Sequence, residues 1–241
     1  MPIKAIFFDL DDTLINDTES SEHWAEVAAR DEAGHLGLDP KDLAEAYLHA
    51  AIDFWERLEP GAGRPLPGDI RPSMWYEALK SRGVDDRELA RRAAKHYDAI
   101  RLEGLELYPD AVPVLKQLHG RYHLAIITNG FAETHEKKIE HLGLVKFFDN
   151  VILAGEMDLI KPDPAVFRHA MEVADVGPEE SVMVGDRYNR DILGAHAAGM
   201  RAILIKVWDE PIPNGARPPE ATIDSIGELP QALAQLENHH E

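Results

Sequence analysis

The chain has 241 residues, of which 44% are hydrophobic and 29% charged, as is typical of a soluble globular protein that buries a core. Its 44 acidic and 25 basic side chains give a formal net charge of −19, which disfavours nucleic acid and anionic membranes as partners. The chain has no cysteine, which excludes disulfides, thiolate catalysis and cysteine-bound zinc.

The first apolar run is too short for a signal peptide, and no stretch approaches the ~18 apolar residues that a membrane helix needs. We therefore expect a cytoplasmic protein without a membrane partner, as a monomer or homodimer. The length favours one domain with a sizeable insertion, or two modest domains.

The chain begins with a nearly continuous apolar run at residues 3–8, which predicts a strand covered on both faces. The region that follows shows only helical patterns, interrupted by a Pro/Gly-rich stretch at residues 59–68. We predict a helical domain over residues 16–102. Its helices are expected at residues 20–32, 40–57, 71–82 and 86–101.

From about residue 105 onward, apolar strand-like runs alternate with helical patterns. This alternation predicts an α/β doubly wound parallel sheet, with a core domain formed by residues 1–15 and 103–241. The expected strands are residues 123–128, 151–154, 181–184 and 201–205, and the expected helices are residues 110–119, 132–142, 164–174 and 189–198.

Carboxylates follow two of the predicted strands. Asp9, Asp11 and Asp12 follow the first strand, so their mutual repulsion must be offset, most simply by a divalent cation. Asp186 and Asp191 follow the strand at residues 181–184, after Gly185, which allows a sharp turn. Hard carboxylate oxygens suit Mg²⁺. The alternative is that these residues only form turns and helix caps.

Two further segments lie between a strand and a helix. Thr128, Asn129 and Gly130 offer a hydroxyl, an amide and a backbone N–H to a phosphate at a helix N-terminus, although an ordinary turn would look the same. Lys161 stands before Pro162, which stiffens the segment and aims the lysine, although a solvated lysine is the alternative.

These four segments resemble the motifs of the haloacid dehalogenase superfamily, in its phosphatase branch. The resemblance follows the order and approximate spacing of the motifs across nearly the whole chain. The helical insertion is similar to the type 1 cap of subfamily I, as in phosphoglycolate phosphatase, 5′-nucleotidase and N-acylneuraminate-9-phosphatase-like members. The matching residues are Asp9, Asp11 and Thr13; Thr128 and Asn129; Lys161; and Gly185, Asp186 and Asp191.

The resemblance implies a nucleophile at Asp9, a general acid and base at Asp11, and a charge-neutralising Lys161. It implies Mg²⁺ bound by Asp9, by the backbone carbonyl of Asp11, and by Asp186 directly or through water. Such a site would form an aspartyl-phosphate and release phosphate from a small phosphorylated metabolite. The alternatives are a phosphomutase of the β-phosphoglucomutase type and a haloacid dehalogenase. A dehalogenase attacks carbon and needs no acid at Asp11.

The remaining implied roles concern the surroundings of these groups. Thr128, with Asn129 and Gly130 beside it, would bind the transferred phosphoryl group. Thr13 and Asp191 would support the ligands, with Asp191 orienting a metal-bound water or Lys161.

The insertion contains side chains that could contact a substrate, although its aromatic residues suit the core of a helical bundle equally well. We predict no metal-binding group among the histidines, and we expect the helix carrying His135 and His141 to lie at the surface. The candidate substrate contacts are His23, Trp24, Trp55, Arg64, Arg71, Trp75 and Tyr76.

Overall fold

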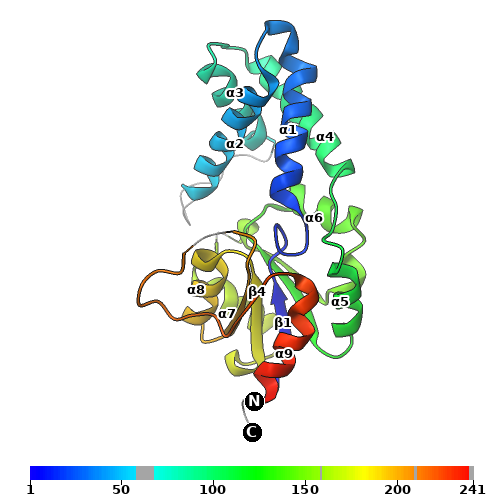
Figure 1. Cartoon of the computed structure of the whole chain (residues 1–241), viewed down its shortest axis with the longest axis vertical. Coiled ribbons are helices and arrows are strands. Elements are labelled where there is room, and N and C mark those ends of the chain that lie inside the picture. Colours follow the sequence, from blue (N-terminus) through cyan, green and yellow to red (C-terminus); the bar gives the residue numbers. More distant parts are fainter. Residues whose placement is uncertain (58–67, 158, 209–210, 239–241) are drawn as a thin grey trace. The chain divides into compact units, whose positions relative to one another are not determined.

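The computed structural model describes residues 1–57, 68–157, 159–208 and 211–238 (Figure 1). The chain forms two compact units. The core unit comprises Met1–Asn16 and Glu106–Glu241, and the helical unit is Asp17–Leu105. No helix in the described ranges is both long and apolar enough to cross a membrane.

The core unit contains a six-stranded sheet in the order β3-β2-β1-β4-β5-β6, and every neighbouring pair is parallel. The prediction of a doubly wound parallel sheet is therefore confirmed. The strands are β1 (Ala5–Phe8), β2 (His123–Thr128), β3 (Asn150–Leu153), β4 (Ser181–Gly185), β5 (Arg201–Ile205) and β6 (Ala221–Ile223).

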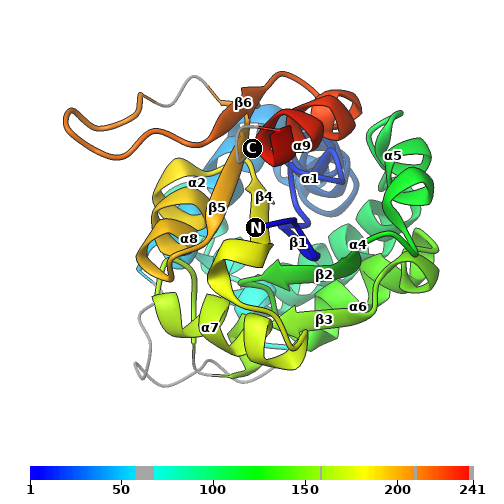
Figure 2. The ribbon, with the colours of Figure 1, turned by 90° about the horizontal axis from the view of Figure 1, so that it is seen from below.

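Helices cover both faces of this sheet, with α7 and α8 on one face and α5 and α9 on the other (Figure 2). All four residues of β1 are buried, as expected for a central strand between two helical layers. Phe7 of β1 packs in one cluster with Met183 of β4 and Phe167 of α7. The helices of this unit are α5 (Ala111–Leu118), α6 (Ala132–His141), α7 (Pro164–Val173), α8 (Leu193–Ala197) and α9 (Leu229–Asn238).

Two elements of the core unit differ from the sequence prediction. Strand β6 was not expected, because three residues in a proline-rich region carry too little apolar pattern to reveal it. The helix expected at residues 189–198 begins instead with a π-helical turn at Tyr188–Ile192 and continues as α8. Such turns often occur at functional sites.

The helical unit consists of α1 (Asp17–Ala33), α2 (Pro40–Glu56), α3 (Ile70–Ser81) and α4 (Arg87–Glu103), as the sequence predicted. Asp39 and Asp86 cap α2 and α4 by accepting backbone N–H groups of the first turn. The core of the unit includes Tyr47 and Trp75, whose rings stack with centroids 4.3 Å apart.

Two of the candidate substrate contacts of this unit have partners within the unit itself. Trp75 is fully buried, which supports its interpretation as bundle core. Arg71 donates to the Tyr47 hydroxyl at 2.9 Å and pairs with Asp98. Arg64 and the side chain of Trp55 lie outside the described residues.

In each unit, the two segments at which the chain passes to the other unit contact each other. In the helical unit, the buried Arg101 donates to both carboxylate oxygens of Asp17 at 2.6 Å. In the core unit, the Asn16 N–H donates to the Glu106 carbonyl at 3.2 Å, and Ile15 forms an antiparallel bridge with Leu107. Each unit therefore holds together its own two ends at the connection between the units.

Candidate functional site

The predicted site residues emerge at one edge of the core sheet. Strand β1 lies between β2 and β4, and Phe8 pairs with Ile126 and Val184. Asp9 directly follows β1, and Asp186 directly follows β4. The strands β2 and β3 lie on one side of β1 and β4 to β6 on the other. Open α/β sheets bind their ligands at such a switch point.

Three carboxylates meet at this edge. Asp9, Asp186 and Asp191 each place one oxygen within 4.8 Å of the others. The Lys161 ammonium lies between two of them, with Nζ 2.8 Å from Asp9 Oδ1 and 2.7 Å from Asp191 Oδ1. The lysine is therefore buried and doubly paired rather than solvated.

The electrostatics of this cluster favour an additional cation. Burial raises the pKa of Asp9 to about 7, although Lys161 acts in the opposite direction. Burial, followed by the charges of Asp9 and Asp191, raises the pKa of Asp186 well above its ordinary value. One lysine cannot offset three ionised carboxylates, whereas a divalent cation with hard oxygen ligands would do so. These residues therefore fit a Mg²⁺ ion chemically.

Asp186 is held from two sides. The Thr13 hydroxyl donates to Asp186 Oδ1 at 3.2 Å, and the Trp208 indole N–H donates to Asp186 Oδ2 at 2.8 Å. The Arg187 guanidinium lies over the Trp208 ring, 4.3 Å from its centroid. Trp208 was not among the residues predicted from the sequence. The available signal was its position just beyond β5, at the edge of the sheet where ligands gather.

Gly185 makes room for Asp191. A Cβ atom on Gly185 would lie 2.4–2.6 Å from atoms of the Asp191 side chain. Asp191 Oδ2 accepts the Arg187 backbone N–H at 3.0 Å, while Oδ1 contacts Lys161. The glycine, interpreted from the sequence as a turn residue, thus also permits the close approach that places Asp191 on the lysine.

The loop after β2 is bonded to the Lys161 segment. The Asn129 side chain accepts the Lys161 N–H at 2.7 Å and donates to the Lys161 carbonyl at 3.1 Å. The Gly130 N–H donates to the Thr128 hydroxyl oxygen at 3.2 Å. Both ends of the Asn129 amide therefore contact the lysine's main chain, a use that the sequence interpretation did not anticipate.

Asp11 turns toward α6. His135 Nε2 lies 3.0 Å from Asp11 Oδ2, and Lys138 Nζ lies 2.7 Å from Asp11 Oδ1. Burial would raise the pKa of Asp11, but Lys138 and His135 outweigh it and hold that pKa well below its usual range. The helix has an exposed face, on which His141 lies, but His135 lies on its buried face. The missed signal was the helical spacing that His135 shares with Ile139 on the buried face.

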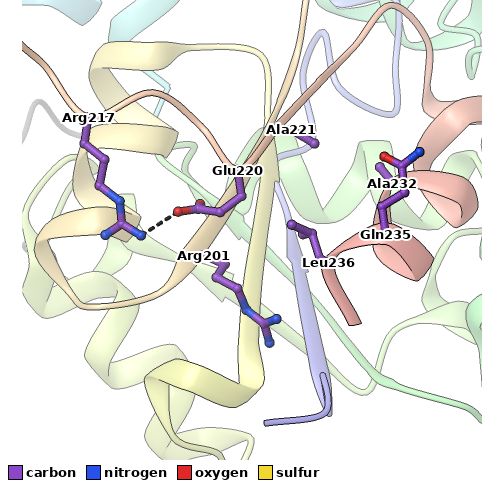
Figure 3. Close-up of a pocket in the computed structure, with 7 residues that line it drawn as sticks. All are labelled: Arg201, Arg217, Glu220, Ala221, Ala232, Gln235 and Leu236. Carbon is purple, nitrogen blue, oxygen red and sulfur yellow. Dashed lines mark hydrogen bonds and ion pairs between the residues drawn. The ribbon is translucent and has the colours of Figure 1, made fainter. Parts of the chain in front are cut away.

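A separate hollow of about 450 Å³ lies elsewhere on the core unit (Figure 3). Figure 3 shows Arg217 paired with Glu220 in its lining. Arg201 and Ala221 begin β5 and β6, so the hollow lies at the amino ends of these strands, away from the carboxylates. Its lining is Arg201, Arg217, Glu220, Ala221, Ala232, Gln235 and Leu236.

Comparison with known proteins gives a consistent family. Residues 3–199 match the family model of haloacid dehalogenase-like hydrolases. A phosphoserine phosphatase of Thermus thermophilus is 35% identical, over 94% of this chain and 96% of its own. The N-acylneuraminate-9-phosphatase of Rattus norvegicus is 30% identical, over 98% of this chain and 95% of its own.

Solved structures share the fold. The magnesium-bound putative HAD-hydrolase YfnB of Bacillus subtilis has a TM-score of 0.80 at 21% identity, covering 97% of this chain and 100% of its own. A 2-haloacid dehalogenase of Pseudomonas syringae has a TM-score of 0.66 at 31% identity, covering 97% and 99%. The chain therefore belongs to the haloacid dehalogenase-like hydrolases, in their phosphatase branch.

Proposed function

We propose that this protein is a Mg²⁺-dependent phosphomonoesterase that transfers the phosphoryl group of a small metabolite to Asp9 and then to water. The observation that carries the proposal is the buried arrangement of Asp9 beside Lys161 and Asp186 at the sheet edge. The phosphatase names of relatives that align over nearly the whole chain support it.

The first step joins a carboxylate oxygen of Asp9 to phosphorus while the ester P–O bond breaks. Lys161, already 2.8 Å from Asp9, offsets the negative charge that the substrate brings. Because Thr128 Oγ1 accepts the Gly130 N–H, its own proton remains free to donate to a phosphoryl oxygen. Asn129 contributes indirectly, by holding the Lys161 segment.

The second step hydrolyses the aspartyl-phosphate on Asp9. We assign Asp11 the proton transfers: it gives a proton to the departing ester oxygen and later takes one from the attacking water. Lys138 and His135 favour the ionised form of Asp11, so the negative charge of the incoming phosphate would have to raise the pKa of Asp11 before the first transfer. Mg²⁺ held by Asp9, Asp186 and the Asp11 carbonyl would supply positive charge that lowers the repulsion between carboxylate and phosphate. Asp191 orients Lys161, and Thr13 orients Asp186.

The helical unit would act as the cap that supplies substrate contacts, with its domain running from about residue 16 to 102 and the remainder forming the catalytic domain. Relatives named for phosphoserine and N-acylneuraminate 9-phosphate point to small polar phosphate esters as the substrate class. Both compounds, together with sugar phosphates, phosphoglycolate and nucleoside monophosphates, form a suitable substrate panel.

The test measures phosphate release from this panel with Mg²⁺ present. We expect Asp9→Asn to abolish release while the circular dichroism spectrum stays unchanged, and EDTA to silence the wild-type protein. The exposed Asp224 provides a matched control, since Asp224→Asn should keep full activity. Release that survives in Asp9→Asn would overturn the assignment of the nucleophile.

The 31% identity to a 2-haloacid dehalogenase supports a second candidate function, attack of Asp9 on carbon with loss of halide. That chemistry needs no acid at Asp11. We expect no chloride release from 2-chloropropionate. A phosphomutase is a further alternative, and sustained release of free phosphate from simple esters would exclude it.

A further inference from the structure

Two buried side chains of α6, His135 and Lys138, contact the carboxylate of Asp11, one on each oxygen. We call them the α6 pair. They occupy successive turns of one helix face, three residues apart, so both reach the loop after β1 from the same side. No motif in the sequence assigned either residue a role.

The α6 pair is less exposed than the carboxylate that it contacts. The side chains of His135 and Lys138 are 6% and 4% exposed, whereas that of Asp11 is 30% exposed. The pair therefore lies behind the carboxylate, and Asp11 keeps an open edge toward solvent. The pair contacts Asp11 from its buried side, so it would act on the substrate through Asp11.

The position of the His135 ring is fixed by its surroundings. Thr134 Oγ1 lies 2.9 Å from His135 Nδ1. A Cβ atom on Gly130 would fall 2.0–2.2 Å from three atoms of the same ring. Because that distance is far below van der Waals contact, the ring occupies the space that a side chain at position 130 would need. Gly130 is thus required for His135 to reach Asp11.

We propose that His135 and Lys138 are positioning residues that hold the Asp11 carboxyl where it meets the leaving oxygen of the substrate. The inference rests on the proposed function, in which the Asp9–phosphorus bond forms, the ester P–O bond breaks, and a proton passes from Asp11 to the departing oxygen. Holding each carboxylate oxygen separately leaves Asp11 little rotational freedom, and such orientation is a large part of catalysis.

The test compares kcat/KM for two substrates that differ in their need for a proton. An alkyl phosphate loses a poor leaving group that requires proton donation, whereas p-nitrophenyl phosphate loses a stable phenolate that does not. We expect Lys138→Met and His135→Leu to lower kcat/KM for the alkyl phosphate about 100-fold. The value for the aryl phosphate should fall less than about 5-fold, since proton donation contributes little there.

Matched variants provide the controls. Lys137, exposed on the same helix, should tolerate Lys137→Met without change in either substrate. His135→Gln keeps an N–H donor at similar reach and should restore most of the activity lost in His135→Leu. If Lys138→Met fails to fold, the two His135 variants alone decide the question.

Equal losses on both substrates, or no rescue by His135→Gln, would overturn the proposal and leave the α6 pair as a structural ion pair. A wild-type protein that releases phosphate from no ester of the substrate panel would instead refute the proposed function. The two failures are therefore distinguishable.

Discussion

Replacing Asn129 by alanine tests whether this residue contacts phosphate or supports Lys161. The substitution removes the hydrogen bonds of 2.7 and 3.1 Å that the amide makes with the Lys161 N–H and carbonyl. A buried backbone group left without a partner costs about 1–3 kcal/mol. Because Asn129 is only half-buried and water can replace part of the loss, we expect a destabilisation of about 2 kcal/mol.

For a chain of this length, that loss corresponds to a fall in Tm of about 4–8 °C. The freed segment would also let the Lys161 ammonium drift from Asp9, and a displacement of about 1 Å can lower a rate ~100-fold. We therefore expect Asn129→Ala to lower kcat by about 10- to 100-fold, with KM for the phosphate ester changed less than about 3-fold.

Steady-state phosphate release and thermal unfolding measure these quantities, with the exposed Asn214→Ala as the control. If Asn129 instead binds the phosphate directly and nothing more, KM should rise while Tm stays constant. That outcome would refute the positioning role of Asn129.

Three further changes test the carboxylate cluster. Trp208→Phe removes the indole N–H from Asp186, so we expect Mg²⁺ affinity to fall about 10-fold by calorimetry; unchanged affinity would show that this bond is dispensable. Burial raises the pKa of Asp9 from 3.8 to about 7. Between these pH values Asp9 is ionised in the unfolded chain but protonated in the folded one, so the free energy of unfolding without metal should fall as the pH rises. Mg²⁺ needs the ionised Asp9 carboxylate, so the affinity for Mg²⁺ should rise with pH up to about 7, and calorimetry should show proton release as a buffer-dependent heat. An affinity and a stability that do not change with pH would contradict the raised pKa of Asp9. Gly185→Ala forces a methyl group against Asp191 and should destabilise the fold by about 1–3 kcal/mol in urea unfolding, whereas a neutral result would mean that the loop relaxes at little cost.

The main elements of the fold were predictable because their sequence patterns are local. The β1 run is apolar throughout, and the helices of the insertion carry helical periodicity with aspartate caps such as Asp39 and Asp86. Strand β6 escaped prediction because it is three residues long and its pairing with β5 is a tertiary property.

In the candidate site too, features that follow from local sequence were predictable, whereas those that depend on tertiary contacts were not. Asp9 and Asp186 were identifiable because both directly follow buried strands, and parallel strands bring their carboxyl ends to one edge. The partners of these groups depend on side-chain directions across the fold. No spacing rule indicates that Asn129 bonds to a main chain 32 residues away, that Trp208 reaches Asp186, or that His135 faces inward.

The contacts Asn16–Glu106 and Asp17–Arg101, which lie where the chain passes between the units, suggest that the helical unit can be removed or replaced. The chain leaves the core unit after Asn16 and returns at Glu106, and these two residues are hydrogen-bonded to each other. The 89 residues between them therefore add little loop-closure entropy to the folding of the sheet. Excising residues 17–105 and bridging the gap with a short turn should therefore yield a self-folding Rossmann-like minimal protein. The same junction could then carry a different helical insertion without changes to the sheet that positions Asp9 and Asp186.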